Sequence, residues 1–243
     1  MSNTVYVTLS HQQLLRDEMG VIAQNIANAT TSAYKGETQL FKEFIFESLD
    51  GDQVTFVQSM GIKRDYTEGR MEHTGNDLDV AINGKGYFVV LGKEGETLTR
   101  QGHFGLDATG TLVTSSGLPV LNADGQPIVI GRGARQIEIG RDGTVATDQA
   151  KIGRLKLVDV ENEGQLERQG EGLFLYRGEE PPKVIPAAQA EVQQGSLEAS
   201  NVNPILEMTR MIEVVRSYQT AQRMMDTESD LMRKAIQDIT STK

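Results

Sequence analysis

The sequence predicts an α+β fold: an α-helix from each end of the chain, the two paired as a coiled coil, with a central all-β domain of barrel or sandwich type and an extended linker. All of the 25 glycines except Gly20 lie between residues 36 and 199, and glycine costs a helix about 1 kcal/mol per residue. The net charge of −10 falls in the same stretch, because the charges of residues 1–35 and of 200–243 cancel. In both end segments, apolar residues recur with helical spacing.

The first helix is expected to run from about Thr4 to Ala29. Its apolar residues are spaced alternately by four and three positions, which places them on one face of a helix. The polar residues 30–32 should end it, because threonine and serine side chains compete for backbone hydrogen bonds. The apolar face consists of Leu15, Met19, Ile22, Ile26 and Ala29.

The last helix is expected to begin at Pro204, because Asn203 can cap it and proline suits the first helical position. Its seam keeps steps of three and four over about five heptads, a pattern typical of coiled coils. Methionines and two polar residues weaken the seam, which favours contacts with several neighbours over one tight partner. The seam consists of Met208, Met211, Val215, Tyr218, Gln222, Met225, Ser229, Met232, Ile236 and Ile239.

The middle of the chain carries short β-strand patterns separated by turn residues. Residues 78–82 alternate between apolar and polar side chains, Asn83 and Gly84 predict a hairpin turn, and residues 87–91 predict the returning strand. Strands at such regular spacing, with no helical period between them, favour a barrel or sandwich. Further strands are predicted at residues 110–114, 118–121, 127–130, 136–139, 143–146, 152–160 and 172–177.

Four segments follow from these patterns. Residues 1–35 form the first helix, and residues 36–70 form an extended linker that leans on its own β domain or on a neighbour. Residues 71–190 form the central β domain, and residues 191–243 form a return segment and the last helix. Since the linker contains the apolar stretch 40–46, it is expected to need a partner surface.

Composition excludes several functional classes. The chain has no cysteine, so disulfides and thiolate metal sites are impossible. No run approaches 18 apolar residues, so no membrane insertion is expected, and the start lacks the pattern of a cleaved secretory signal. An acidic chain does not attract nucleic acid. The three histidines, His11, His73 and His103, lack metal-ligand spacing.

No catalytic residue, cofactor site or metal site is therefore predicted, and the protein is expected not to be an enzyme. The pairs Asp124–Gly125 and Asp142–Gly143 are interpreted as turns and not as calcium loops, because they lack the alternating oxygen ligands of such loops. Four asparagines stand out at the ends of the two helices. They either cap the helix ends or set the register of a helical core from buried positions, where an unpartnered amide costs about 1–3 kcal/mol. These are Asn25, Asn28, Asn201 and Asn203.

Three motifs in order resemble the rod and hook proteins of the bacterial flagellar axis. They are AQNIANATTSAYK at 23–35, LDVAINGKGYF with TRQGHF at 78–88 and 99–104, and GSLEASNVN at 195–203, followed by Glu207–Met208 and Met211–Ile212. The chain departs from the family pattern at Gln24, Ala33 and Tyr34, where asparagine, glycine and phenylalanine are usual. Within the family, residues 3–12 resemble the opening of proximal rod proteins.

This resemblance implies a structural subunit of the flagellar basal-body rod that assembles through its terminal helices into a helical tube. It implies contacts with copies of itself, with neighbouring proximal and distal rod subunits, and with the flagellar type III export apparatus. It also implies a place in the rod that crosses the periplasm, reached without cleavage of a signal. Two alternatives remain open: a distal rod or hook-type axial subunit, and a ligand-binding or enzymatic β protein.

The sequence also suggests how assembly and folding are linked. A single end helix is marginally stable, because most helical stability comes from packing. We therefore expect the two end helices to be poorly ordered in the free monomer and to become ordered on assembly.

Overall fold

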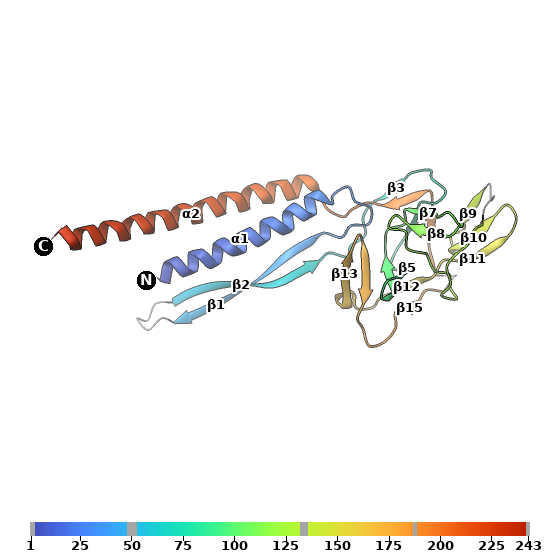
Figure 1. Cartoon of the computed structure of the whole chain (residues 1–243), viewed down its shortest axis with the longest axis horizontal. Coiled ribbons are helices and arrows are strands. Elements are labelled where there is room, and N and C mark those ends of the chain that lie inside the picture. The colour runs from blue at the N-terminus through green and yellow to red at the C-terminus, as the bar shows by residue number, and fades with distance from the viewer. Residues whose placement is uncertain (1–2, 48–52, 132–135, 187–188, 242–243) are drawn as a thin grey trace. The chain divides into compact units, whose positions relative to one another are not determined.

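A computed structural model describes residues 3–47, 53–131, 136–186 and 189–241 (Figure 1). Backbone contacts divide the chain into two compact units. The helical unit combines residues 1–29, 35–65 and 202–243, and the β unit combines residues 30–34 and 66–201. Among the residues described, no helix is both long and apolar enough to cross a membrane.

Two helices dominate the helical unit, and they lie side by side (Figure 1). The first, α1, spans Asn3–Ala27, close to the predicted bounds. The second, α2, spans Pro204–Ser241 and begins at the predicted residue. The Asn203 side chain caps it, since its Oδ1 accepts hydrogen bonds from the backbone N–H groups of Ile205 (3.1 Å) and Leu206 (3.3 Å).

A long β-hairpin occupies most of the stretch that was expected to be an extended linker. Strand β1 (Glu37–Glu47) pairs antiparallel with β2 (Gln53–Arg64), and both strands pack against α1. The linker expectation is therefore corrected, and the partner of the apolar stretch is a helix of the same unit. Gly61 lies where the register shifts, and its φ of +117° explains why a glycine occupies this position.

The β unit is built from short strands. Its largest sheet has six strands in the order β13-β14-β6-β5-β12-β15, and a second sheet has the order β11-β10-β9. Three two-stranded pairs, β16-β4, β17-β3 and β7-β8, complete the described strands. The strands are β3 Met71–His73, β4 Val80–Ile82, β5 Tyr87–Gly92, β6 Gly95–Thr99, β7 Phe104–Leu106, β8 Leu112–Thr114, β9 Ile137–Ile139, β10 Thr144–Thr147, β11 Lys151–Arg154, β12 Leu157–Asp159, β13 Leu166–Gly170, β14 Leu173–Tyr176, β15 Lys183–Val184, β16 Val192–Gln194 and β17 Ser196–Glu198.

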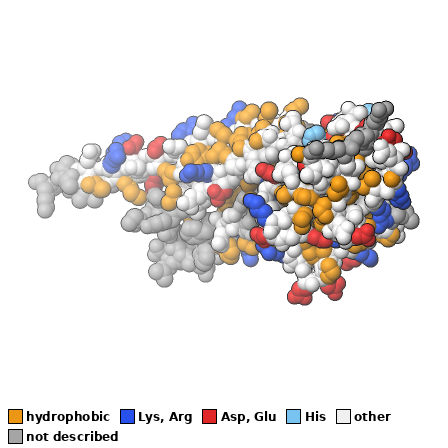
Figure 2. All heavy atoms as spheres, turned by 45° about the vertical axis from the view of Figure 1, so that its right-hand side comes forward, with side chains coloured by type: hydrophobic (Ala, Val, Ile, Leu, Met, Phe, Trp, Pro, Cys, Tyr) orange, Lys and Arg blue, Asp and Glu red, His pale blue; other side chains and the backbone are white. Residues whose placement is uncertain are grey.

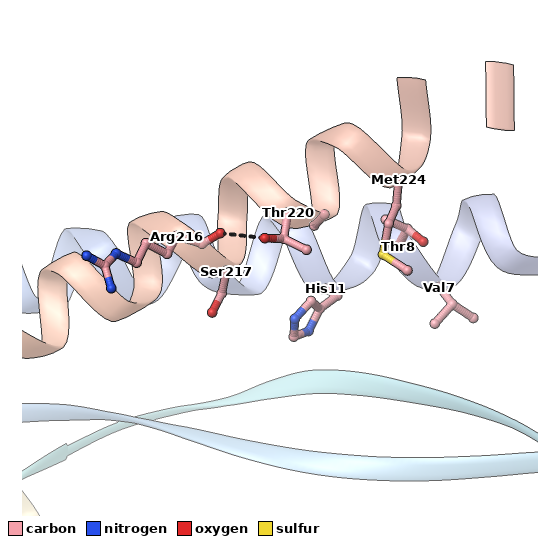
Figure 3. A pocket seen from close by; sticks show the side chains of 8 residues that line it. Val7, Thr8, His11, Arg216, Ser217, Thr220 and Met224 are labelled. Carbon is pink, nitrogen blue, oxygen red and sulfur yellow. Dashed lines mark hydrogen bonds between the residues drawn. The ribbon is translucent and has the colours of Figure 1, made fainter. Parts of the chain in front are cut away.

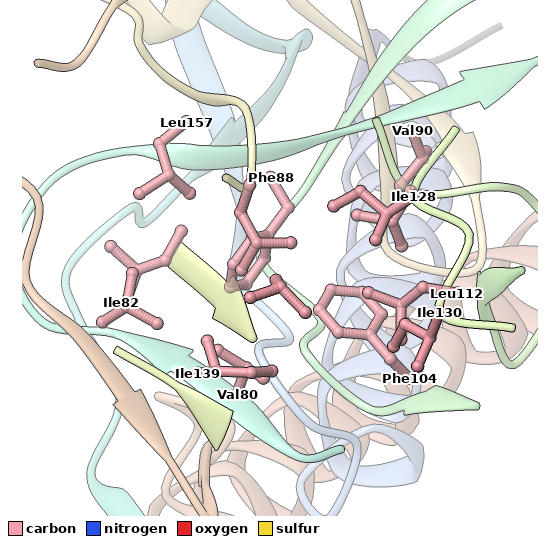
Figure 4. Packing of buried hydrophobic residues seen from close by; sticks show 14 residues of the cluster. Val80, Ile82, Phe88, Val90, Phe104, Leu112, Ile128, Ile130, Ile139 and Leu157 are labelled. Carbon is pink, nitrogen blue, oxygen red and sulfur yellow. The ribbon is translucent and has the colours of Figure 1, made fainter. Parts of the chain in front are cut away.

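A barrel or a sandwich was predicted, and because the six-stranded sheet is open, a closed barrel is not formed. Strand β5 is buried on both of its faces. Its side chains belong to two hydrophobic clusters, one on each face of the sheet. Phe88 and Val90 point into the larger cluster, where the Phe88 ring meets Phe104 edge-on with 5.2 Å between ring centroids (Figure 4). Tyr87 and Val89 point into the second cluster on the opposite face. Apolar side chains are therefore buried on both faces of one open sheet.

The hairpin predicted around Asn83 and Gly84 is not formed. Strand β4 pairs with β16, and β5 pairs with β6 and β12. Two carbonyls of the segment between β4 and β5 bind Arg100 instead. The Arg100 Nη1 donates to Gly84 O (2.8 Å) and to Gly86 O (2.6 Å). A side chain that is distant in the sequence therefore binds this segment, and β4 and β5 lie in different sheets.

In two turns of the β unit, threonine residues donate hydrogen bonds to an aspartate carboxylate. Hydrogen bonds from Thr109 and Thr111 hold the pKa of the Asp107 carboxyl below its ordinary value. Hydrogen bonds from Thr144 do the same for the pKa of Asp142. In the part of the chain that the structure describes, no three His, Asp or Glu side chains are grouped as a metal site would require.

Candidate assembly surface

The two helices meet through a narrow apolar seam. Leu15 and Ile22 of α1 and Val214 of α2 are buried there, and Met19, Ile26, Met211 and Tyr218 pack around them. Four of the five predicted α1 residues, Leu15, Met19, Ile22 and Ile26, thus lie together against α2, and so do Met211 and Tyr218 from the predicted α2 seam. Ala29 is half-buried and lies beyond the end of α1. A second stripe of α1, with Leu14 and Val21, is also buried, so α1 has two covered faces.

The α2 stripe that faces α1 shares Met211 and Tyr218 with the predicted seam and is shifted by one position at the other residues. Val214 (8% exposed) and Ala221 (5% exposed) are the buried residues, whereas Val215 is only half-buried and Gln222 is exposed. The stripe Glu207, Met211, Val214, Tyr218 and Ala221 also keeps steps of four and three, so spacing alone does not distinguish the two stripes. The polar residue Gln222 in the predicted seam was the signal against it.

The remaining predicted seam residues lie towards solvent. Met225 is half-buried and Ser229 is exposed. Met208, Met232 and Ile236 are 51%, 36% and 62% exposed. The side chain of Ile239 falls outside the described part of the structure. Of these residues, those whose side chains are described do not belong to the apolar cluster between the two helices.

Asn25 is the one predicted asparagine that is fully buried, and it joins α1 to both β1 and α2. Its Nδ2 donates to the Glu37 carbonyl at the start of β1 (2.7 Å), and its Oδ1 accepts from the Glu37 N–H (2.9 Å). Its Nδ2 also donates to Glu207 Oε2 on α2 (3.1 Å). One side chain therefore fixes the position of a strand and a helix relative to α1.

Two arginines complete this polar cluster. Arg64 of β2 donates to Glu37 Oε1 through Nε (3.0 Å) and Nη2 (2.7 Å). Arg210 donates to Glu207 Oε1 (3.2 Å) one turn along α2. Glu37 and Glu207 are 5% and 7% exposed, so each carboxylate is buried with a cationic partner. Glu37 and Arg64 carry no strong signal in the sequence, because they meet only through the register in which β1 pairs with β2.

The other three asparagines occupy helix ends and the return segment. Asn28 donates to Gln24 O at the end of α1 (2.8 Å). Asn203 is the cap of α2 described above. Asn201 belongs to the β unit, where its Nδ2 donates to Thr67 O (3.1 Å) and Thr67 Oγ1 (3.2 Å). Of the four asparagines, Asn25 has the geometry for register setting, and the others have the geometry of caps or local ties.

The helical unit exposes many large apolar side chains (Figure 2). Three of them, Ile205 (76%), Met208 (51%) and Ile212 (53%), follow one another at steps of three and four along the start of α2. The hairpin adds Met60 (58%) and Ile62 (53%). Apolar residues gathered in this way are typical of protein contact sites.

A hollow of about 450 Å³ lies between the helices near the start of α1 (Figure 3). Val7, Thr8 and His11 line it from α1, opposite the small residue Ala221 and Met224 of α2. The Thr220 hydroxyl donates to the Arg216 carbonyl (2.9 Å), so it is occupied within its own helix. The seam is therefore tight near Ile22 and loosely packed near His11.

The β unit has a polar cluster of its own around Arg100, which is 5% exposed. Besides the two turn carbonyls, its guanidinium donates through Nε to Glu198 Oε2 (2.9 Å). The other oxygen of Glu198 accepts from the Gly69 N–H (3.0 Å). This cluster ties the return segment that leads to α2 into the β unit, so it anchors one end of the connection to the helices.

Comparison with known proteins places the chain in a family. Residues 81–147 match the model described as flagellar hook protein FlgE/F/G D1 domain, and residues 193–238 match flagellar basal body rod FlgEFG protein C-terminal. The flagellar basal-body rod protein FlgF of Caulobacter vibrioides is 38% identical, with 98% of each chain covered. FlgF of Escherichia coli is 31% identical over 95% of each chain, and FlgG of Bacillus subtilis is 30% identical over 97% of this chain and 98% of its own.

The chain belongs to the FlgF family of flagellar basal-body rod proteins. It is a structural subunit of the rod, located in the flagellar basal body.

Residues of the motifs that resemble the family contact each other in the fold of this rod protein. Arg100 from the central motif binds Glu198 from the C-terminal motif. Gly102 of the same motif is needed because a Cβ there would lie 1.5 Å from Val80 O. Ala33, where the family usually has glycine, adopts a φ of +55°.

Proposed function

We propose that this rod subunit assembles through its two terminal helices, paired as a coiled coil, into a helical tube. The observation that carries the proposal is the exposed stripe Ile205, Met208 and Ile212 on α2. A stripe of this kind costs solubility in a monomer, and burial against a neighbour stabilises the assembly by about 1.5–3 kcal/mol per large side chain. Repeated copies of one contact that does not close give a helical tube.

The charge distribution supports the orientation of the subunit in that tube. The two chain ends are neutral, so many copies can pack closely at the centre without mutual repulsion. The central stretch carries the whole net charge of −10, which suits an outer, solvated surface. We therefore infer that the helices line the inner wall and that the β unit faces outwards.

The partners follow from the same role. We infer contacts with copies of this chain and with neighbouring proximal and distal rod subunits, a proximal position in the rod, and passage through the flagellar type III export apparatus into the periplasm. A chain without cysteine can be exported unfolded and can fold in an oxidising space without wrong cross-links. The function proposed is structural and requires no catalysis.

A charge in the exposed stripe tests this proposal. Ile212→Asp is expected to abolish incorporation into basal bodies and therefore swimming, because an unpaired carboxylate would be buried at the contact. The free chain should unfold at the wild-type temperature, since Ile212 is 53% exposed. Swimming assays, immunoblots of purified basal bodies and thermal unfolding measure the three quantities.

Thr227→Asp is the matched control, because it adds the same charge to an exposed polar position of the same helix. It should assemble normally. Wild-type incorporation of Ile212→Asp would reject the stripe as an assembly surface.

Folding of the helices should be coupled to assembly. We expect the amides of residues 7–27 and 204–237 to exchange faster in the free chain, where the helical unit is folded but marginally stable, than in purified basal bodies, because neighbouring copies cover the exposed stripe. The amides of β5 and β6 should be protected in both states and serve as the internal control. Equally strong protection of the helices in the free chain would contradict coupled folding.

A further inference from the structure

A groove of about 560 Å³ runs between α1 and the hairpin of the helical unit. Arg16, Asp17 and Gly20 line it from α1, and Gln39, Ser59 and Ile62 line it from β1 and β2. Ile62 is 53% exposed at its rim. The groove therefore combines an apolar edge, polar walls and a glycine.

Gly20 is unexplained by the packing of the chain itself. It lies inside α1, where glycine is less favourable than alanine. A Cβ built on it would meet no atom within 4 Å, so nothing in the described chain requires the missing side chain. A bare backbone at that point allows close approach by another molecule.

The end of α2 is the complementary feature. Helix α2 has 38 residues and α1 has 25. Glu207 bonds Asn25, and Met224 lines the same hollow as Thr8, so the helices run antiparallel. The last three turns or so of α2 therefore extend beyond Asn3. Leu231 and Met232, in this overhang, are 57% and 36% exposed.

We propose that the overhang of α2 in one copy packs into the α1–hairpin groove of a second copy, directly over Gly20. This proposal rests on the assembly function proposed above and names the contact. The overhang cannot reach the groove of its own chain, because a continuous helix carries it away past the start of α1. Donor and acceptor surfaces on different parts of one chain give a head-to-tail contact that repeats without closing.

The charges of the two surfaces are complementary. Arg16 and Asp17 line the groove, and Asp230 and Arg233 lie on the overhang. Within the described residues, none of these four side chains makes an ion pair. The overhang also carries Lys234, so each surface offers at least one cation and one anion to the other, which favours one orientation of the overhang in the groove.

Disulfide trapping tests the contact in a background without cysteine. Cells that express Gly20→Cys and Leu231→Cys copies together should yield a cross-linked dimer of this chain in oxidised basal bodies. Neither variant alone should yield it, and neither should Gly20→Cys combined with Thr209→Cys, which lies at the opposite end of α2. Incorporation of both variants without a cross-link would overturn the contact but leave the rod function intact. Absence of the wild-type chain from basal bodies would reject both.

Bulk at Gly20 gives a second, independent test. Gly20→Leu is expected to abolish incorporation, because the side chain fills the space that the overhang needs. The purified variant should unfold at or above the wild-type temperature, since there is room for the side chain in the free chain. Gly20→Ala is the conservative control, with a raised unfolding temperature and a smaller loss of incorporation. Normal incorporation of Gly20→Leu would overturn the proposal.

Discussion

Exchange of Arg100 for leucine is expected to lower the free energy of unfolding of the β unit by about 3–5 kcal/mol, the usual cost of leaving one partner of a buried ion pair alone. Glu198, 2% exposed, would lose its cationic partner, and the carbonyls of Gly84 and Gly86 would lose a donor. Because the chain has no tryptophan, near-ultraviolet circular dichroism of the buried tyrosines in a urea titration is the suitable measurement.

The double variant Arg100→Leu with Glu198→Leu is the control for this prediction. Removal of both charges also takes away the buried carboxylate that had lost the Arg100 guanidinium, so the double variant should be more stable than Arg100→Leu alone. A loss below about 1 kcal/mol for Arg100→Leu, the range of a surface ion pair, would contradict the buried role of Arg100.

Asn25→Leu is expected to lower the free energy of unfolding of the helical unit by about 2–4 kcal/mol. The change leaves the N–H and C=O of Glu37 without their partner, and each buried unsatisfied group costs about 1–3 kcal/mol. It also removes the hydrogen bond to Glu207, so the hairpin and α2 both lose their tie to α1. Far-ultraviolet circular dichroism during thermal unfolding measures the helices.

Asn28→Leu is the matched control, since Asn28 lies on the same helix and its side chain donates to a carbonyl in its own last turn. Its loss should stay near 0.5 kcal/mol, as for substitutions away from buried networks. Because incorporation depends on the same unit, Asn25→Leu should also reduce the amount of chain in basal bodies. Equal stability of the two asparagine variants would contradict a special role for Asn25.

The parts of the fold that depend on interactions between residues close in the sequence could be predicted. Helix limits follow from short-range chemistry, such as the Asn203 side chain on the first free N–H groups of α2 and the lack of glycine in the end segments. The Asp142–Gly143 turn follows equally from local hydrogen bonds. The strand pairing around Asn83 could not be found in this way, because the partner that binds the turn is Arg100.

The sequence by itself determined the two end helices, their caps, the β character of the middle and the family, because each depends on neighbouring residues or on contiguous motifs. Only the tertiary structure decided that Val214 and not Val215 faces α1, that residues 37–64 form a hairpin on α1, and that Asn25 connects three elements. The physical reason is that a helical period defines stripes on a helix but does not say which stripe a partner covers. Adjacent stripes with equal spacing differ only in the groups that they meet across space.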